Sequence, residues 1–440
     1  MLLLMAKALM PVCLILFSIL SSAPSFAANI PFSKQYQVVE INGIDMPSLN
    51  GLDFNNLSVF AFRNGTLTPI PFQFEDMDID GNTYFVKGEA PLRGQKDIFD
   101  NHDALFFLLA DTGDQLTPFP RNNTHVLSEV KITLENTSRY VYVATGMSMN
   151  PAFATDDMST VKNATNLSPS KYVHFNKDTG LIETSQYSLQ TDPENFLLWS
   201  QLRYHDMQTD EDNNILDSLK IRMSAGILAK YPRLTLTNKN FFMNVLDVKD
   251  GPVRSIILLS GKVKVAGFTV LYVNFHVAVL PSELELEVRV RVPSIFKHVI
   301  HSPNTSLSLE CRNIKGGIFR TSLGPVQPAI IDGHISPLEQ SLIQKGIDND
   351  HTWIWVSTRK NLDVFATMFI SKNFTAPISL YYRDEKPNES NANLGPNDNL
   401  GSNNNLGPND NTGPNIGYRI HDIPVDVSFK FQFNIIMSGD

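Results

Sequence analysis

The chain has 440 residues, of which 42% are hydrophobic and 18% charged, enough apolar content for one large β-domain or for two or three domains. Its formal net charge is −9, which argues against a nucleic-acid-binding protein, because such a protein needs a basic face, and against docking on an anionic membrane. These totals limit the class of protein but name no activity.

The first 27 residues have the pattern of an export signal. Lys7 precedes an apolar run from Ala8 to Leu20, and Ser25-Phe26-Ala27 places small residues where signal peptidase recognises them. The alternative is a membrane anchor, but the run is shorter than the about 20 apolar residues that a transmembrane helix needs. We therefore expect cleavage after Ala27, a periplasmic or secreted location, and a soluble mature chain without a transmembrane span.

An acidic turn after the first strands has half the pattern of a calcium-binding loop. Asp76, Asp78 and Asp80 alternate and are followed by Gly81, a spacing that folds three carboxylates around one cation. The twelfth position, which should carry a bidentate glutamate, is Lys87. We predict calcium as the one candidate cofactor, with further ligands from elsewhere; the alternative is an acidic turn that holds no metal.

Period-two alternation recurs along most of the chain. In residues 283–292, Leu284, Leu286 and Val288 point one way, while the intervening Glu and Arg side chains point the other. The last such run, residues 425–435, alternates valines and phenylalanines with polar residues. One buried and one solvated face are typical of antiparallel sheets, so we predict an all-β protein with an antiparallel β-sandwich fold.

The pattern also predicts one short helix and two domains. Ser336, Pro337 and Glu339 form a capping box with proline at the first helical position, which predicts a helix near 336–346. We expect an N-terminal β-sandwich domain over 28–160 and a larger one over 161–440. Within the latter, a six-residue repeat of turn-forming residues predicts a disordered loop at 386–417.

Few residues carry recognisable chemistry. Trp353 and Trp355 share a strand face and are candidates for stacking on a sugar, although aromatic residues spaced in this way are more often core. Tyr204 and His205 are candidate binding residues, but neighbours on a strand point to opposite faces and cannot act together directly.

The sequence offers no recognisable nucleophile or catalytic motif. Cys311 remains alone after export and is expected to be a buried hydrophobic residue rather than a nucleophile. No metalloprotease, nucleophile-elbow, phosphate-loop or dinucleotide motif occurs.

Several stretches together resemble a family of exported bacterial β-rich proteins of unassigned function. These are IPFQFEDMDIDGNTYFV at 70–86, DIFDNHDALFFLLADTGDQ at 97–115, LDSLKIR at 216–222 and VLDVKDGPVRSI at 245–256. The GPVR turn that leads into long strands is also similar to part of the β-supersandwich domains of polysaccharide lyases and sugar mutarotases. The resemblance implies an exported, supersandwich-like fold and identifies no catalytic residue in this chain.

Three functions follow as hypotheses. The first is a non-enzymatic exported protein that binds a glycan or a cell-envelope partner, since no catalytic motif is found. The second is a polysaccharide-lyase-like enzyme, in which a tyrosine or histidine would abstract a proton. The third is a structural component of the cell envelope.

Overall fold

The computed structural model describes residues 36–117, 125–133, 138–145, 171–207, 213–265, 267–291, 298–324, 327–347, 352–370, 374, 376–384, 414–424 and 428–439. The predicted export signal and the predicted domain boundary at 160/161 lie outside these residues. So does most of the predicted repeat loop at 386–417. None of the helices in the described ranges combines the length and apolar character needed to cross a bilayer.

The N-terminal strands form two small antiparallel sheets. One has the order β1 (Val38–Asn42), β5 (Ala104–Leu108), β4 (Phe72–Glu75); the other has β3 (Thr66–Pro69), β2 (Leu57–Arg63), β7 (Ser138–Thr145), β6 (Val126–Thr133). Residues of both sheets share one core, among them Val59, Leu105, Phe107 and Val141.

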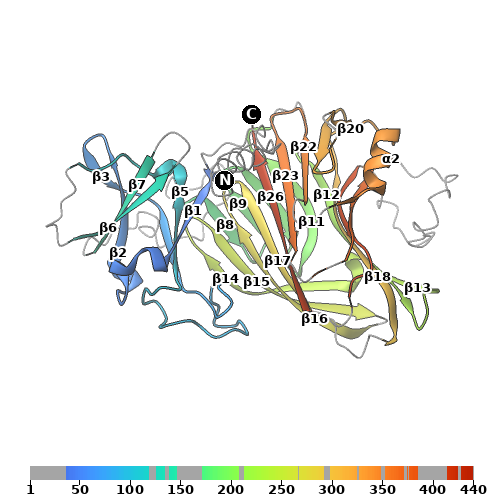
Figure 1. The fold of residues 1–440 in the computed structure, drawn as a ribbon, viewed down its shortest axis with the longest axis horizontal. Coiled ribbons are helices and arrows are strands. Elements are labelled where there is room, and N and C mark those ends of the chain that lie inside the picture. Colours follow the sequence, from blue (N-terminus) through green and yellow to red (C-terminus); the bar gives the residue numbers. More distant parts are fainter. Residues whose placement is uncertain are drawn as a thin grey trace, which may run out of the picture.

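The remaining strands build a much larger sandwich (Figure 1). One layer is a nine-stranded sheet, in the order β14 (Phe241–Asp250), β15 (Ser255–Val265), β16 (Phe268–Val279), β17 (Glu283–Arg291), β26 (Ser428–Ser438), β23 (Asp363–Ile370), β22 (Thr352–Ser357), β19 (Ile318–Thr321), β20 (Ala329–Ile330).

Two further sheets share a core with this layer. The first contains β11 (Asn195–Tyr204), β10 (Tyr187–Asp192), β9 (Leu181–Thr184) and β8 (Val173–Asn176). The second contains β13 (Arg233–Leu236), β12 (Leu216–Ile227), β18 (Ile300–Cys311), β25 (Asn415–Ile420), β24 (Ile378–Arg383) and β21 (Gly346–Ile347). One hydrophobic cluster includes residues of all three sheets. The prediction of an all-β, antiparallel sandwich is confirmed.

The alternation read from the sequence determines which side chains enter this core. On β17, Leu284, Leu286 and Val288 are buried between the sheets. The predicted helix is also confirmed as α2 (Pro337–Gln344), where Ser336 Oγ accepts from Glu339 N at 3.3 Å and Ser336 N donates to Glu339 Oε2 at 2.6 Å.

The end of the predicted repeat loop needs a correction. Asn415–Gly417 are not loop but the first residues of β25, a strand that we did not predict. Ile416 is buried in the main core, where it anchors the start of this strand.

The N-terminal part packs on the outer face of the nine-stranded sheet. Phe85 clusters with Ile256 and Leu258 of β15, and Arg289 of β17 forms an ion pair with Asp80. The face of β17 that alternation predicts to be solvated is therefore partly covered by the N-terminal part of the chain.

Candidate functional site

A cavity of about 460 Å³ lies between the six-stranded and nine-stranded sheets. Its wall is almost entirely hydrocarbon, and no charged side chain is found among the described residues that form it. The six-stranded sheet contributes Ile221, Met223, Ala225, Ile227, Leu234, Leu236 and Leu307; the nine-stranded sheet contributes Phe241, Met243, Val263, Val265, Val273, Phe275, Leu286, Val288, Phe431 and Phe433.

The cavity exists because the two sheets separate along β12. Near the start of this strand, Leu216 and Leu219 are fully buried in the core. Further along, Ile221, Met223 and Ile227 point to the same side but are only partly buried, because no side chain of the opposite sheet closes over them. Apolar side chains thus continue to face inward up to the end of β12, but the opposite sheet packs only against those near its start.

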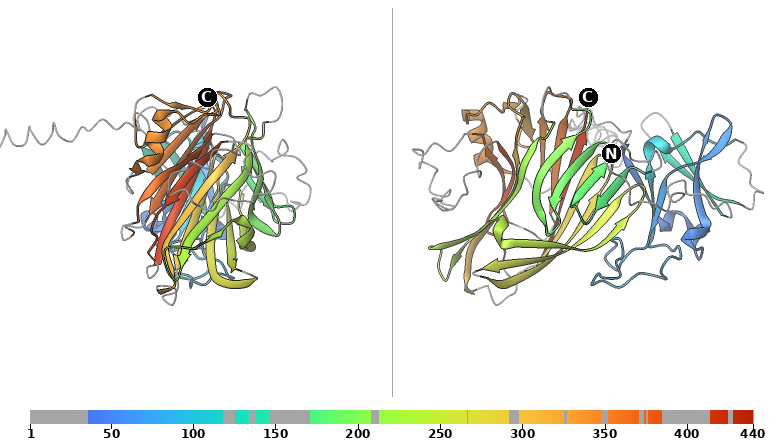
Figure 2. Two further views of the ribbon diagram at one scale, coloured as in Figure 1. Left: turned by 90° about the vertical axis from the view of Figure 1, so that its right-hand side faces the viewer. Right: turned by 180° about the vertical axis from the view of Figure 1, so that it is seen from behind.

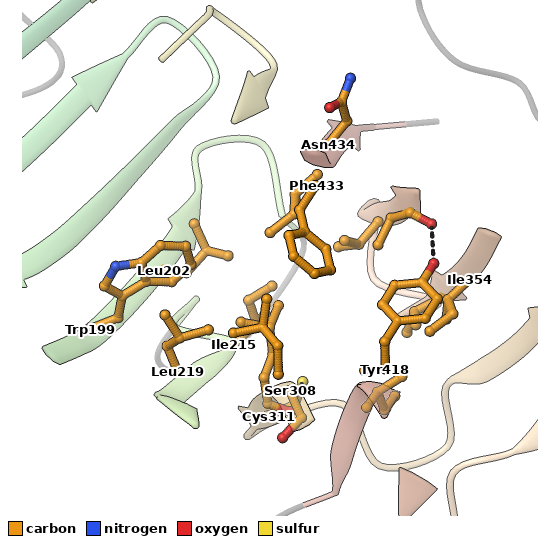
Figure 3. A pocket seen from close by; sticks show the side chains of 18 of the residues that line it. Trp199, Leu202, Ile215, Leu219, Ser308, Cys311, Ile354, Tyr418, Phe433 and Asn434 are labelled. Atoms are coloured by element: carbon orange, nitrogen blue, oxygen red, sulfur yellow. Dashed lines mark hydrogen bonds between the residues drawn. The ribbon is translucent and has the colours of Figure 1, made fainter. Parts of the chain in front are cut away.

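A smaller compartment of about 80 Å³ shares part of its wall with the main cavity; its lining side chains are drawn in Figure 3. Leu219 and Phe433 belong to the walls of both compartments. Tyr418 Oη donates to the Ala366 carbonyl at 3.0 Å, so the polar atom of this ring is satisfied by the protein. Cys311 also lines the compartment, and burial raises the pKa of its thiol to about 12, as expected for a residue used for packing and not as a nucleophile.

Tyr204 and His205, two of the residues singled out from the sequence, do not line either compartment. Tyr204 is buried, and its Oη donates to Gln186 Oε1 at 3.0 Å; burial raises its pKa to about 12. His205 Nδ1 lies 3.2 Å from the Ser185 carbonyl oxygen. Each side chain is thus held by a contact of its own.

A third group, His174, which could serve as a base in a lyase mechanism, is paired with a carboxylate. Its Nδ1 lies 2.8 Å from Asp250 Oδ2, which also accepts from Lys171 Nζ at 2.8 Å. Burial acts to raise the pKa of Asp250, but the hydrogen bonds and charges of His174 and Lys171 outweigh it and lower that pKa. This arrangement stabilises an ionised Asp250.

Trp353 and Trp355 lie on the outer face of the nine-stranded sheet, while Ile354 between them points into the small compartment. The Trp353 ring stacks on Phe365 with 5.8 Å between ring centroids. Trp355 Nε1 donates to Asp363 Oδ2 at 3.1 Å. Across the described residues, no contact joins this pair to Tyr204 or His205, so the four predicted residues do not form one site.

The acidic turn is held together by its own backbone and by an arginine. Asp78 Oδ1 accepts from Asp80 N at 2.8 Å and from Asn82 N at 2.9 Å, and Asp80 pairs with Arg289. Asp76 Oδ1 accepts from Asp97 N at 2.9 Å. Within the described ranges no group of three or more His, Cys, Asp or Glu side chains is arranged to hold a metal, and calcium at this turn stays a prediction.

Comparison with known proteins gives no family. No family model and no curated protein matches the chain. Among solved structures, an α-mannosidase from Enterococcus faecalis V583 is similar over 92% of this chain and 42% of its own, with a TM-score of 0.45 and 8% identity. A 4-α-glucanotransferase from Thermococcus litoralis is similar over 62% of this chain and 40% of its own, with a TM-score of 0.24 and 8% identity. The chain thus spans less than half the length of each, and neither likeness is high enough to assign an activity to it.

Proposed function

We propose that this protein binds an amphiphile whose hydrocarbon chain occupies the main cavity. The observation that carries the proposal is the cavity itself: about 460 Å³ of space bordered by aliphatic and aromatic side chains. Small-molecule sites typically occupy about 300–1,000 Å³. A cavity of about 150 Å³ already suffices for benzene.

The chemistry of the wall selects the ligand. Water inside such a cavity would find very few hydrogen-bonding partners, and a charged group would lose its hydration without compensation. A hydrocarbon chain has no hydrogen bonds to lose, and its transfer from water is favourable by about 0.8 kcal/mol for each buried methylene. About ten buried methylenes would give roughly 8 kcal/mol before the entropic cost of association.

The export signal predicted from residues 1–27 supports a site of action outside the cytoplasm. A binding role without catalysis agrees with our first hypothesis from the sequence, with a lipid-like molecule as the cell-envelope partner. The polysaccharide-lyase hypothesis gains no support from the cavity, because the described residues of its wall include no base.

Binding of cis-parinaric acid, a fatty acid that fluoresces in apolar surroundings, tests the proposal. Saturable binding of about one probe per protein is expected for the wild type. Ala225 faces the cavity, so Ala225→Leu should weaken binding and Ala225→Trp should abolish it, whereas Ala110→Trp, on the surface of the N-terminal part, should bind normally. Absent or non-saturable binding by the wild type, or equal binding by a folded Ala225→Trp variant, would refute it.

A glycan site on the outer face is a second candidate function. Trp353 and Trp355 present partly exposed indoles beside a hydrogen-bonded carboxylate, and the Arg320 guanidinium lies 5.6 Å from the Trp355 ring centre. The C–H face of a sugar stacks on such rings, while its hydroxyls bond to flanking charged groups.

Fluorescence titration tests the glycan site. Trp199→Phe leaves Trp353 and Trp355 as the only tryptophans, so their fluorescence can be titrated with chitohexaose and cellohexaose. A change lost in Trp355→Ala is expected; no change with either oligosaccharide counts against this candidate.

A further inference from the structure

Three large hydrophobic side chains are exposed at the end of the sandwich next to the main cavity. Leu228 and Tyr231, on the β12–β13 turn, are 74% and 58% exposed, and Phe268, at the start of β16, is 77% exposed. We call these three residues the apolar rim. Tyr272, which is 68% exposed, pairs with Lys262 and lies on the outer face of the sheet, opposite to the cavity-lining Val263 and Val273.

The apolar rim is continuous with the cavity wall. Ile227, immediately before Leu228, lines the cavity, and Val265, which lines it from the other sheet, is the cross-strand partner of Phe268. Figures 1 and 2 show the β12–β13 and β15–β16 hairpins together at the end of the sandwich that is remote from the N-terminal sheets. A flat surface could therefore approach the rim without meeting the N-terminal part.

Basic residues accompany the rim. Lys230, Arg233, Lys262 and Lys264 lie on the same two hairpins, and segments 218–246 and 251–282 contain no Asp or Glu, although the whole chain carries −9. Asp422, on the loop after β25, is an acidic exception near the β18 side of the cavity.

In the part of the chain that the structure describes, three of these positive charges have neutral partners. Arg233 donates to Ser224 Oγ at 2.9 Å and to the carbonyl of Ser302 at 2.8 Å. Lys264 Nζ lies 4.3 Å from the centre of the Phe242 ring, and Lys230 Nζ 6.0 Å from that of Tyr231. The basic side chains thus remain available to an anion.

We propose that this end of the sandwich docks on a bilayer that contains anionic lipids, and that the cavity receives its hydrocarbon chain from that bilayer. This inference rests on the proposed function. Exposed aromatic rings are suited to the headgroup level of a membrane, and an exposed apolar patch of this kind marks an interaction site. Lysines and arginines beside them attract anionic headgroups even though the net charge of the protein is negative.

Vesicle sedimentation tests the docking. Wild-type protein should pellet with vesicles of two parts phosphatidylcholine to one part phosphatidylglycerol, far less with phosphatidylcholine alone, and less as salt is raised. Lys230→Ala/Lys262→Ala should lower the partition coefficient by roughly 25-fold, from about fivefold per lysine. Leu228→Ser/Phe268→Ser should lower it at least as much.

Two matched controls sit elsewhere on the surface. Phe369 on β23 is 53% exposed and Lys177 is exposed on the β8–β9 turn, so Phe369→Ser and Lys177→Ala should pellet as the wild type does. Failure of the wild type to bind anionic vesicles, or an equal loss in the two controls, would overturn the docking.

The same variants separate docking from the proposed function. The two double variants of this end should still bind cis-parinaric acid in solution, because the cavity wall is unchanged. Normal probe binding without vesicle binding by the wild type would leave the cavity function standing and exclude the docking. Vesicle binding by a wild type that takes up no probe would exclude the ligand cavity instead.

Discussion

Arg254 holds the N-terminal sheets against the large sandwich through Glu75. Arg254 Nε donates to Glu75 Oε1 at 2.7 Å, a second nitrogen of the guanidinium contacts Oε2, and the guanidinium carbon lies 3.5 Å from the centre of the Phe106 ring. Gln73 Nε2 also donates to Glu75 Oε1, at 2.6 Å. This buried cluster lies where two segments about 180 positions apart in the sequence meet.

Glu75→Gln is expected to destabilise the protein by about 3 kcal/mol, because it leaves a buried guanidinium without its counter-ion. Denaturation by urea measures this loss. The matched control is Lys87→Met, which removes the exposed 3.9 Å pair with Asp247 that links the same two parts. That variant should lose less than about 0.5 kcal/mol, and equal losses in both would contradict our description of the interface.

The Glu75 pair should also make the protein sensitive to acid. Burial acts to raise the pKa of Glu75, but the charge and hydrogen bonds of Arg254 and the hydrogen bond from Thr83 lower it below 4.5 overall. Because the pKa of Glu75 is lower in the folded state, its contribution to the free energy of unfolding is fully present above pH 4.5. This contribution is lost as the pH falls through the pKa of the folded state. Melting temperatures of wild type and Glu75→Gln should therefore converge in acid; a gap that stays constant with pH would contradict this.

Glu283 on β17 should have the opposite pH dependence. Burial, and secondly the charge of Glu285, raise its pKa from 4.5 to about 7. Its contribution to stability is fully present below pH 4.5 and is lost as the pH rises through about 7, an effect of at most about 3 kcal/mol. Glu283→Gln should match the wild type near pH 4.5 and melt at a higher temperature near pH 8. Equal melting temperatures of the two proteins at both pH values would show that the carboxylate is well solvated.

Calcium binding at the acidic turn is tested by two variants of Asp78. If the turn binds calcium, the melting temperature of the wild type rises with added calcium. Asp78→Ala should abolish this rise and also destabilise the turn, because Asp78 Oδ1 accepts from two backbone N–H groups. Asp78→Asn should abolish the rise while it preserves an acceptor oxygen and most of the stability. A wild type that does not respond to calcium ends the metal prediction.

The sequence predicted those parts of the fold that depend on local pattern. Alternation on β17 placed Leu284 and Leu286 inside, and the Ser336 capping box located α2. The interface with the N-terminal part was missed, although the continuous apolar run at 256–259 is a signal for it. Such a run is typical of a strand covered on both faces, and Ile256 packs under Phe85.

The cavity could not be predicted, because alternation tells which way a side chain points but not how far apart two sheets lie. Met223 and Leu284 give the same signal in the sequence, yet Leu284 is packed in the core and Met223 borders open space. A net charge of −9 is a total over the whole chain, and it does not describe the segments 218–246 and 251–282, which contain no Asp or Glu. The candidate site thus depends on tertiary spacing.

The most direct test of the central claim is a crystal structure of the protein with a fatty acid that carries bromine on its terminal carbon. Anomalous scattering then locates the end of the chain without reference to a fitted ligand. We predict a bromine peak between the two large sheets, close to Met223 and Phe275. A peak only on the outer face of either sheet, or none in crystals grown with saturating ligand, would contradict the account.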